Sequence, residues 1–306
     1  MNRVWKIRTS RGLFAVKVLN RDERGPLFGQ ALPASFQVEE AAVRAGIPTP
    51  RPIPTRAGDG YLAEIPRPDG PPALVRAHEW AAGWPPGAGR DERRLAGRVG
   101  ALLAGIHALP IDSVDGETII PPPREDVWRR LQERGCQAGA AWAVRLAELI
   151  PVFVELERLV LDARAAERSR GPIHGDADQK NFLVSPVRLL IFDWDMAGVG
   201  SPSQEIATAA LDWGGVYRGA VDARVARSLL EGYADAGGAV PVPAPTAFGG
   251  FFSGILRWLE FNLRRSLGEV DEDERSRKVA EQEVASALRN MPRFAAFVDD
   301  WVYALS

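Results

Sequence analysis

The strongest signal in this chain lies in two neighbouring stretches, His174-Gly175-Asp176-Ala177-Asp178-Gln179-Lys180-Asn181 and Leu189-Leu190-Ile191-Phe192-Asp193-Trp194-Asp195. One Asp stands five residues before an Asn, and a second Asp ends an apolar run that is typical of a strand. A strand-loop-strand hairpin would bring the side chains of Asp176, Asn181 and Asp193 together. Phosphoryl transfer requires a carboxylate to orient the attacking hydroxyl and hard oxygen ligands for the magnesium that neutralises the phosphates. The spacing therefore predicts that Asp176 orients a hydroxyl and that Asn181 and Asp193 hold the metal.

A purely local interpretation of these residues is also open. Asp, Asn and Gly populate turns for conformational reasons, so Asp176 and Asn181 would be turn formers and Asp193 would end a strand. An isolated His-Gly-Asp would favour that interpretation. The Asn at its fixed spacing and the Asp-Trp-Asp strand beside it favour the chemical one.

The neighbouring polar residues carry weaker predictions. His174 is interpreted as a loop organiser, because Asp176 already takes the proton-handling position. Asp195 is expected to cap the following turn rather than to reach a second metal. Asp178 and Lys180 either contact phosphate or substrate, or are solvated charges.

The composition excludes several other classes of protein. With 306 residues, of which 46% are hydrophobic and 25% charged, the chain can bury a large core as one two-lobed unit. Its net charge of -2 provides no general electrostatic attraction for the phosphates of a nucleic acid. Its single cysteine, Cys136, rules out an internal disulfide and suits a reducing cytosol. No apolar run reaches the ~18 residues of a membrane span. We therefore expect a cytoplasmic protein with neither a membrane nor a nucleic acid as partner.

The periodicity of apolar residues changes along the chain. Residues 4–9 and 13–18 indicate a β-hairpin, Ser35 could cap a helix over residues 36–45, and residues 60–65 and 73–78 indicate two further strands. Beyond residue 83 the period becomes helical, with an apolar stripe of Leu95, Val99, Leu102, Leu103 and Ile106. Further helices are predicted over residues 125–135, 140–166, 221–236, 248–267 and 274–289, and the aromatic run that starts at Phe248 is expected in the core. We therefore divide the chain into residues 1–78 and 79–306.

These motifs resemble those of the aminoglycoside phosphotransferase family, the antibiotic and small-molecule kinases that share the protein-kinase-like fold. The family's HGDxxxxN corresponds to residues 174–181, and its strand-borne Asp-Trp corresponds to Asp193-Trp194. Ala15-Val16-Lys17-Val18 resembles the family's lysine strand, and residues 39–50 resemble the passage from helix to strand that follows it. The resemblance extends to about Trp213. It implies a two-lobed α+β fold, with a small β-rich N-terminal lobe that binds nucleotide and a larger, mainly helical C-terminal lobe.

The resemblance also implies roles for residues of the N-terminal region. Lys17 would contact the α- and β-phosphates of ATP, and Glu39 would hold that lysine in place. Glu40 is the alternative partner, because successive helix residues point about 100° apart and only one of the two can face the cleft. Backbone groups near Glu79 and Ala81 would contact the adenine.

The chain departs from the family at its start. Family members usually carry a Gly-containing nucleotide loop before the lysine strand, whereas here residues 1–3 stand about where that loop should be. Either the first strand is missing or translation starts further upstream. The resemblance therefore assigns no residues to a backbone grip on phosphate.

The function expected from these observations is transfer of the γ-phosphoryl group of ATP, with Mg²⁺, to a hydroxyl of a small molecule. An aminoglycoside-like or other antibiotic is the favoured acceptor, and a metabolic amino alcohol, amino acid or sugar is the alternative. A non-catalytic nucleotide-binding protein on the same fold is the rival from another class. The acceptor, the choice of ATP or GTP and the oligomeric state stay open at this point.

Overall fold

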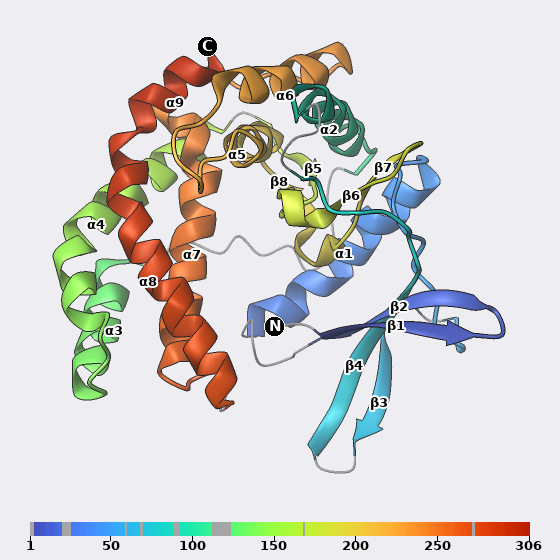
Figure 1. Ribbon diagram of the computed structural model, residues 1–306, viewed down its shortest axis with the longest axis horizontal. Helices are drawn as coiled ribbons and strands as arrows, with labels where there is room; N and C mark the ends of the chain where they lie inside the picture. Colours follow the sequence, from blue (N-terminus) through green and yellow to red (C-terminus); the bar gives the residue numbers. More distant parts are fainter. Residues whose placement is uncertain are drawn as a thin grey trace. The chain divides into compact units, whose positions relative to one another are not determined.

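The computed structural model describes residues 3–19, 26–58, 60–67, 70–87, 92–111, 124–167, 169–270 and 273–306 (Figure 1). Contacts divide the chain into two units. The first comprises Met1–Arg90, Leu109–Thr118 and His174–Val199, and the second comprises Asp91–Ala108, Ile119–Ile173 and Gly200–Ser306. All the side chains predicted to carry the chemistry therefore belong to the first unit, although they are up to 178 residues apart in the chain.

The first unit contains an antiparallel sheet with the strand order β1-β2-β4-β3. The strands are β1 (Arg3–Thr9), β2 (Gly12–Leu19), β3 (Ala63–Arg67) and β4 (Gly70–Glu79), which confirms the predicted N-terminal hairpin. The register of β2 and β4 pairs Lys17 with Arg76 and Leu19 with Leu74. Because side chains alternate along a strand, these four lie on one face of the sheet.

Helix α1 (Pro26–Arg44) contacts this face of the sheet. Its Leu32 packs with Leu19 and Leu74 in a small core, which Phe36 and Leu62 extend. The helix begins ten residues before the predicted start, so the prediction that Ser35 caps it was wrong. Ser35 is buried inside the helix, where its hydroxyl donates to the Leu32 carbonyl at 2.9 Å.

A short β-hairpin in the first unit carries the predicted site. Strands β6 (Phe182–Val184) and β7 (Leu189–Ile191) pair antiparallel, between the 3₁₀ turns η1 (Gln179–Asn181) and η2 (Trp194–Met196). Two hydrogen bonds attach the hairpin to the chain after α1: the Ile191 N–H donates to the Pro48 carbonyl at 3.0 Å, and the Trp194 indole donates to the Thr49 hydroxyl at 2.9 Å. Strands β5 (Gly171–Ile173) and β8 (Gly198–Gly200) precede and follow this segment.

The second unit is built from helices. They are α2 (Glu92–His107), α3 (Glu125–Gln137), α4 (Ala143–Ala166), α5 (Pro202–Trp213), α6 (Ala223–Asp235), η3 (Pro245–Phe248), α7 (Gly249–Ser266), α8 (Glu274–Ala296) and α9 (Val298–Leu305). The predicted helices agree with these bounds to within a few residues, except that α8 continues to Ala296. Helices α5 and α9 are not among the predicted ranges.

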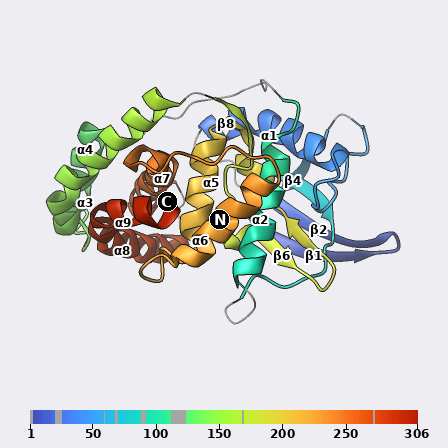
Figure 2. The same cartoon turned by 90° about the horizontal axis from the view of Figure 1, so that it is seen from above.

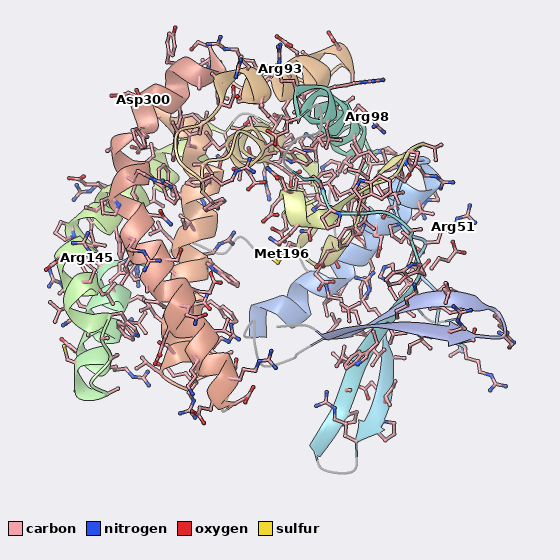
Figure 3. All side chains as sticks on the ribbon, viewed as in Figure 1. Arg51, Arg93, Arg98, Arg145, Met196 and Asp300 are labelled. Carbon is pink, nitrogen blue, oxygen red and sulfur yellow. The ribbon has the colours of Figure 1, made fainter. Side chains whose placement is uncertain are left out.

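Helices α2 and α6 pack side by side, as Figures 1 and 2 both show. Glycine allows this close approach, because a Cβ at Gly232 would clash with the Gly97 carbonyl and one at Gly100 with the Leu229 carbonyl. The predicted apolar stripe of α2 is buried, whereas Arg93 and Arg98 on its other side are exposed (Figure 3). The amphipathic pattern therefore determined the orientation of this helix.

An aromatic cluster forms part of the core of the second unit. Phe251 lies 5.3 Å from the rings of Phe252, Phe294 and Trp301, measured between ring centroids, and all four side chains are buried. The prediction that the aromatic run belongs to the core is confirmed, apart from the exposed Trp258 and the half-buried Phe261. Within the described part of the chain, no helix has the length and apolar character that crossing a membrane requires.

Candidate active site

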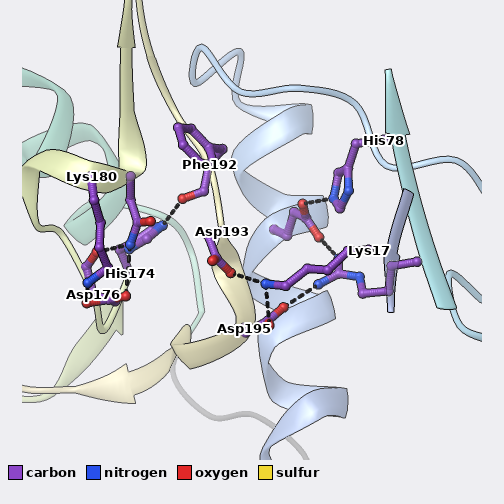
Figure 4. Close-up of polar contacts among 11 residues, drawn as sticks. Lys17, His78, His174, Asp176, Lys180, Phe192, Asp193 and Asp195 are labelled. Carbon is purple, nitrogen blue, oxygen red and sulfur yellow. Dashed lines mark hydrogen bonds and ion pairs between the residues drawn. The ribbon is translucent and has the colours of Figure 1, made fainter. Parts of the chain in front are cut away.

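Asp176 and Asn181 contact each other directly. The Asn181 amide nitrogen donates to the Asp176 carboxylate and to the Asp176 carbonyl, at 2.8 Å in both cases. The Lys180 ammonium lies 3.1 Å from the other oxygen of this carboxylate and 2.6 Å from Asp178 (Figure 4). The Asp176 side chain remains 34% exposed, so the carboxylate is held in place by neighbours while still being open to an incoming group.

The glycine between His174 and Asp176 is required by the backbone. Gly175 has φ +79°, a region that side chains with a Cβ rarely occupy. A Cβ at this position would also clash with the Met196 carbonyl oxygen. Gly175 therefore lets the loop before Asp176 approach the turn after Asp193.

Asp193 has an unusual backbone conformation. With φ 68° and ψ 62°, it is the only non-glycine residue with positive φ in the part of the chain that the structure describes. The preceding residue is fixed on both sides: the Phe192 N–H donates to the Asn181 carbonyl at 3.0 Å, and the His174 ring donates to the Phe192 carbonyl at 3.2 Å. Residues held in such sparsely populated conformations cluster at functional sites. The contact with Phe192 agrees with the predicted organising role of His174.

Lys17 binds a different partner from the one expected. Its ammonium donates to Asp193 at 2.5 Å and to Asp195 at 2.6 Å (Figure 4). The predicted pairing of Lys17 with Glu39 was therefore wrong for this structure. Glu39 is instead bound by the Arg76 guanidinium and, at 2.8 Å, by the His78 ring. The cause is the sheet register, which places Arg76 beside Lys17 and next to the same helix.

Two further expectations also need revision. Glu40, the alternative partner of Lys17, accepts a hydrogen bond from the Tyr61 hydroxyl at 2.8 Å. Asp195 was expected to cap a turn, but its side chain is buried and pairs with Lys17 and, at 3.2 Å, with Arg76. Asp195 and Arg76 are thus the residues that the sequence interpretation missed. The sequence did contain one signal, because Arg76 is a cation within an apolar strand. A buried cation is stable only when a carboxylate lies beside it.

The charges of the site shift two pKa values. Burial alone would raise the pKa of Glu39, but the hydrogen bonds and charges of His78 and Arg76 outweigh it and lower that pKa below its ordinary value. Burial alone would lower the pKa of Lys180, but the Asp176 and Asp178 carboxylates raise it. Both groups are therefore held in their charged forms.

The two residues expected near the adenine lie at the end of β4 and just after it. The Glu79 N–H donates to the Arg51 carbonyl at 2.9 Å, and the Trp80 N–H donates to the Leu13 carbonyl at 3.0 Å. These two amides are thus committed within the protein. A nucleotide contact near Glu79 and Ala81 stays a prediction.

The side chains of Asn181 and Asp193 are of types that could hold a magnesium ion together with nucleotide phosphates. The Asn181 amide nitrogen is directed to Asp176, so its Oδ1 is the atom that can accept a metal, and the Asp193 carboxylate is 31% exposed. No group of three or more His, Cys, Asp or Glu side chains among the described residues comes together as a metal site. Magnesium does not require one, because it is usually bound through one or two carboxylates plus substrate phosphates and waters.

Comparison with known proteins agrees with this geometry. Residues 1–239 match the phosphotransferase enzyme family, APH. No curated protein matches the sequence.

Solved structures share the fold at low sequence identity. A spectinomycin phosphotransferase in complex with ADP and spectinomycin is 12% identical, with a TM-score of 0.65 over 95% of this chain and 88% of that one. An amicoumacin kinase in complex with AMP-PNP and Ca²⁺ is 14% identical, with a TM-score of 0.64 over 98% and 85%. A microcompartment-associated aminopropanol kinase is 18% identical, with a TM-score of 0.57 over 97% and 93%. The predicted α+β kinase-like fold is therefore confirmed, and the chain belongs to the phosphotransferase enzyme family, whose members are kinases that phosphorylate hydroxyl groups of small molecules.

Proposed function

We propose that this enzyme uses ATP and Mg²⁺, and that Asp176, Asn181, Asp193 and Lys17 carry the transfer. One observation supports this assignment above all: Asn181 binds the Asp176 carboxylate with its side chain and the Phe192 N–H, next to Asp193, with its carbonyl. A single residue thus connects the proposed proton acceptor with the proposed metal ligand. Small movements of one would be transmitted to the other, which suits a reaction that depends on positioning.

Each residue has a distinct role in the proposed reaction. Asp176 orients the acceptor hydroxyl and accepts its proton as the oxygen attacks the γ-phosphorus and the bond from that phosphorus to the leaving ADP breaks. The Lys180 ammonium keeps the Asp176 carboxylate in place. Asn181 Oδ1 and the Asp193 carboxylate would hold the magnesium, which would neutralise charge on the phosphates. Lys17 would contribute a fixed positive charge to the α- and β-phosphates.

Adenine would bind near the end of β4 through the backbone. Since the N–H groups of Glu79 and Trp80 are already used, the Glu79 carbonyl and the Ala81 backbone are the groups we propose for this contact. Such contacts would serve ATP and leave little side-chain signature.

We propose an antibiotic hydroxyl, aminoglycoside-like or of another class, as the acceptor. Two proteins of similar structure are antibiotic kinases, which supports this choice. They are the spectinomycin phosphotransferase and the amicoumacin kinase. The second candidate is an amino alcohol, which the likeness to an aminopropanol kinase favours.

The test is a screen for ADP release over antibiotics and amino alcohols, run on the wild type and on Asp176→Ala in parallel. The wild type should turn over at least one acceptor, and Asp176→Ala should lose about 10² to 10⁴-fold in kcat, the usual contribution of a general base. The affinity for ADP, measured by calorimetry, should stay unchanged in the variant. Full activity of Asp176→Ala would remove Asp176 from the mechanism, and nucleotide binding without turnover of any acceptor would favour the non-catalytic alternative.

A further inference from the structure

Two cations face each other on the sheet of the first unit. Lys17 on β2 and Arg76 on β4 are direct partners in the antiparallel register, so their side chains lie on the same face. Like charges at such positions destabilise a sheet unless an acid separates them. Asp195 does so, because one of its oxygens accepts from Lys17 at 2.6 Å and the other from Arg76 at 3.2 Å.

The five charges form an alternating chain. Glu39 binds Arg76, Arg76 binds Asp195, Asp195 binds Lys17, and Lys17 binds Asp193. The side chains of Glu39, Arg76 and Asp195 are each 1% exposed, and Lys17 is 11% exposed. Buried charges are stable only when paired, and Glu39 with Arg76 and Asp195 with Lys17 make two complete pairs.

Asp193 is the one carboxylate of this chain of charges that lies outside the two buried pairs. It is also the most exposed member of the chain, at 31%. The two buried pairs do not require the Asp193 carboxylate. Asp193 can therefore move from Lys17 to a divalent cation, and each buried charge still has a partner. Lys17 would keep Asp195 as its partner when this happens.

We propose that Asp195, rather than Glu39, is the carboxylate that positions Lys17 for the nucleotide. Arg76 holds Asp195, and Glu39 acts only indirectly, by holding Arg76. Contact of the Arg76 guanidinium with the Phe36 ring, 4.5 Å from the ring centroid, further fixes this arginine. The inference rests on the proposed function, because it assigns to Lys17 a contact with nucleotide phosphates.

The assignment has a consequence for metal binding. With Asp195 present, Lys17 can release Asp193 to magnesium. Without the Asp195 carboxylate, Asp193 becomes the sole carboxylate left to Lys17, and the ammonium would compete with the metal. Loss of Asp195 should therefore weaken nucleotide binding and raise the magnesium concentration that binding requires.

The experiment compares Asp195→Asn with Glu39→Gln, two isosteric changes at equally buried carboxylates. ADP affinity is measured by calorimetry with and without Mg²⁺, together with KM for ATP and for the acceptor. We expect Asp195→Asn to weaken Mg-ADP binding about tenfold or more, the size of a lost charge-assisted hydrogen bond, with KM for the acceptor unchanged. Glu39→Gln should change Mg-ADP binding less than about threefold. The opposite ranking of the two variants would overturn the proposal.

A second set of variants separates positioning from a structural role. In a double-mutant cycle with Lys17→Met, Asp195→Asn should add little to the loss of ADP affinity, because Asp195 acts through Lys17. The double variant removes one positive and one negative charge together, so it keeps the interior neutral and protects against misfolding of the single variant. Equal losses from Asp195→Asn in both backgrounds would show an independent effect and would contradict the proposal. If the wild type binds no ADP, the proposed function is overturned together with this inference. If the wild type binds ADP and the variants bind it equally well, only this inference is overturned.

Discussion

Each of the two units contains a buried polar cluster, and the two clusters end differently. In the first unit, the chain from Glu39 to Lys17 ends at the partly exposed Asp193. In the second unit, His107 bonds the Tyr233 hydroxyl with Nδ1 and the Glu205 carboxylate with Nε2, each at 2.8 Å. The His107 and Glu205 side chains are 5% and 7% exposed, and Tyr233 is buried too. The hydrogen bonds are similar in length, so their geometry alone does not distinguish the clusters.

What distinguishes them is whether a charge remains available to a ligand. One neutral tautomer of His107 fits both contacts, with Nε2–H donating to Glu205 and the Tyr233 hydroxyl donating to Nδ1. Both ring nitrogens of His107 are thus used within the cluster and do not bind a metal or a phosphate. The first cluster keeps one carboxylate at its exposed end, on a backbone held in an uncommon conformation. We infer that the first cluster serves catalysis and that the second stabilises the fold.

The largest expected effect is on Asp193. Asp193→Asn keeps the side-chain shape and a residue type that tolerates positive φ, so the variant should fold. It removes the charge that would hold magnesium, which is worth several kcal/mol in the transition state, so kcat should fall about a thousandfold. Steady-state kinetics with the acceptor found in the screen measure this loss, and Asp222→Asn, a helix cap on α6 that Asn can replace, is the matched control. Wild-type activity in Asp193→Asn would place the metal elsewhere.

The second cluster should respond in stability rather than in activity. His107→Ala removes the imidazole that contacts the buried Glu205 carboxylate, which should cost about 3 kcal/mol in the free energy of unfolding. Glu205→Gln keeps an acceptor for His107 and should cost less than about 1.5 kcal/mol. Denaturant titration measures both, and kcat per folded molecule should stay at the wild-type value. A variant of His107 that is stable but inactive would contradict the division of roles.

Tyr233 allows a smaller change to be examined against pH. Burial and the charge of Glu205 raise the pKa of Tyr233 to about 12. The folded protein therefore keeps this proton where the unfolded chain, with a tyrosine pKa of about 10, has lost it. Stability from this group is complete below pH ~10 and falls as the pH rises towards 12. Tyr233→Phe should cost about 1 kcal/mol near neutral pH and should flatten this alkaline decline. Melting curves of both proteins between pH 7 and 12 measure the difference, and an unchanged alkaline slope would show that Tyr233 does not cause it.

The sequence predicted those parts of the candidate site that depend on local spacing. Asp176 and Asn181 stand within one loop and contact each other, and the hairpin that leads to Asp193 follows within twenty residues, so periodicity and turn chemistry were enough to predict this loop and hairpin. The apolar stripe of α2 was predictable for the same reason.

The rest depended on contacts between distant segments. Whether Glu39 meets Lys17 or Arg76 is decided by the register of β2 and β4, whose paired residues are about sixty positions apart. The sequence around Asp195 is equally compatible with a turn cap. Its pairing with Lys17 and Arg76 depends on the position of two strands that are distant in the chain. The start of α1 was missed because Ser35, a common cap, instead bonds back to a helix carbonyl.

An exposed ion pair provides the smallest expected effect. The Arg145 guanidinium and the Glu148 carboxylate on α4 lie 2.7 Å apart, closer than the His107 ring and the Glu205 carboxylate, but the two side chains are 49% and 55% exposed. Figure 3 labels Arg145. Water solvates both charges whether or not they meet, so Arg145→Ala should change the free energy of unfolding by less than about 0.5 kcal/mol. This change in the free energy of unfolding should depend little on salt concentration, because water and ions already screen the exposed pair. Denaturant titration beside His107→Ala measures the contrast. A loss of stability in Arg145→Ala as large as that in His107→Ala would mean that the distance between two charges, rather than their burial, sets the size of the effect.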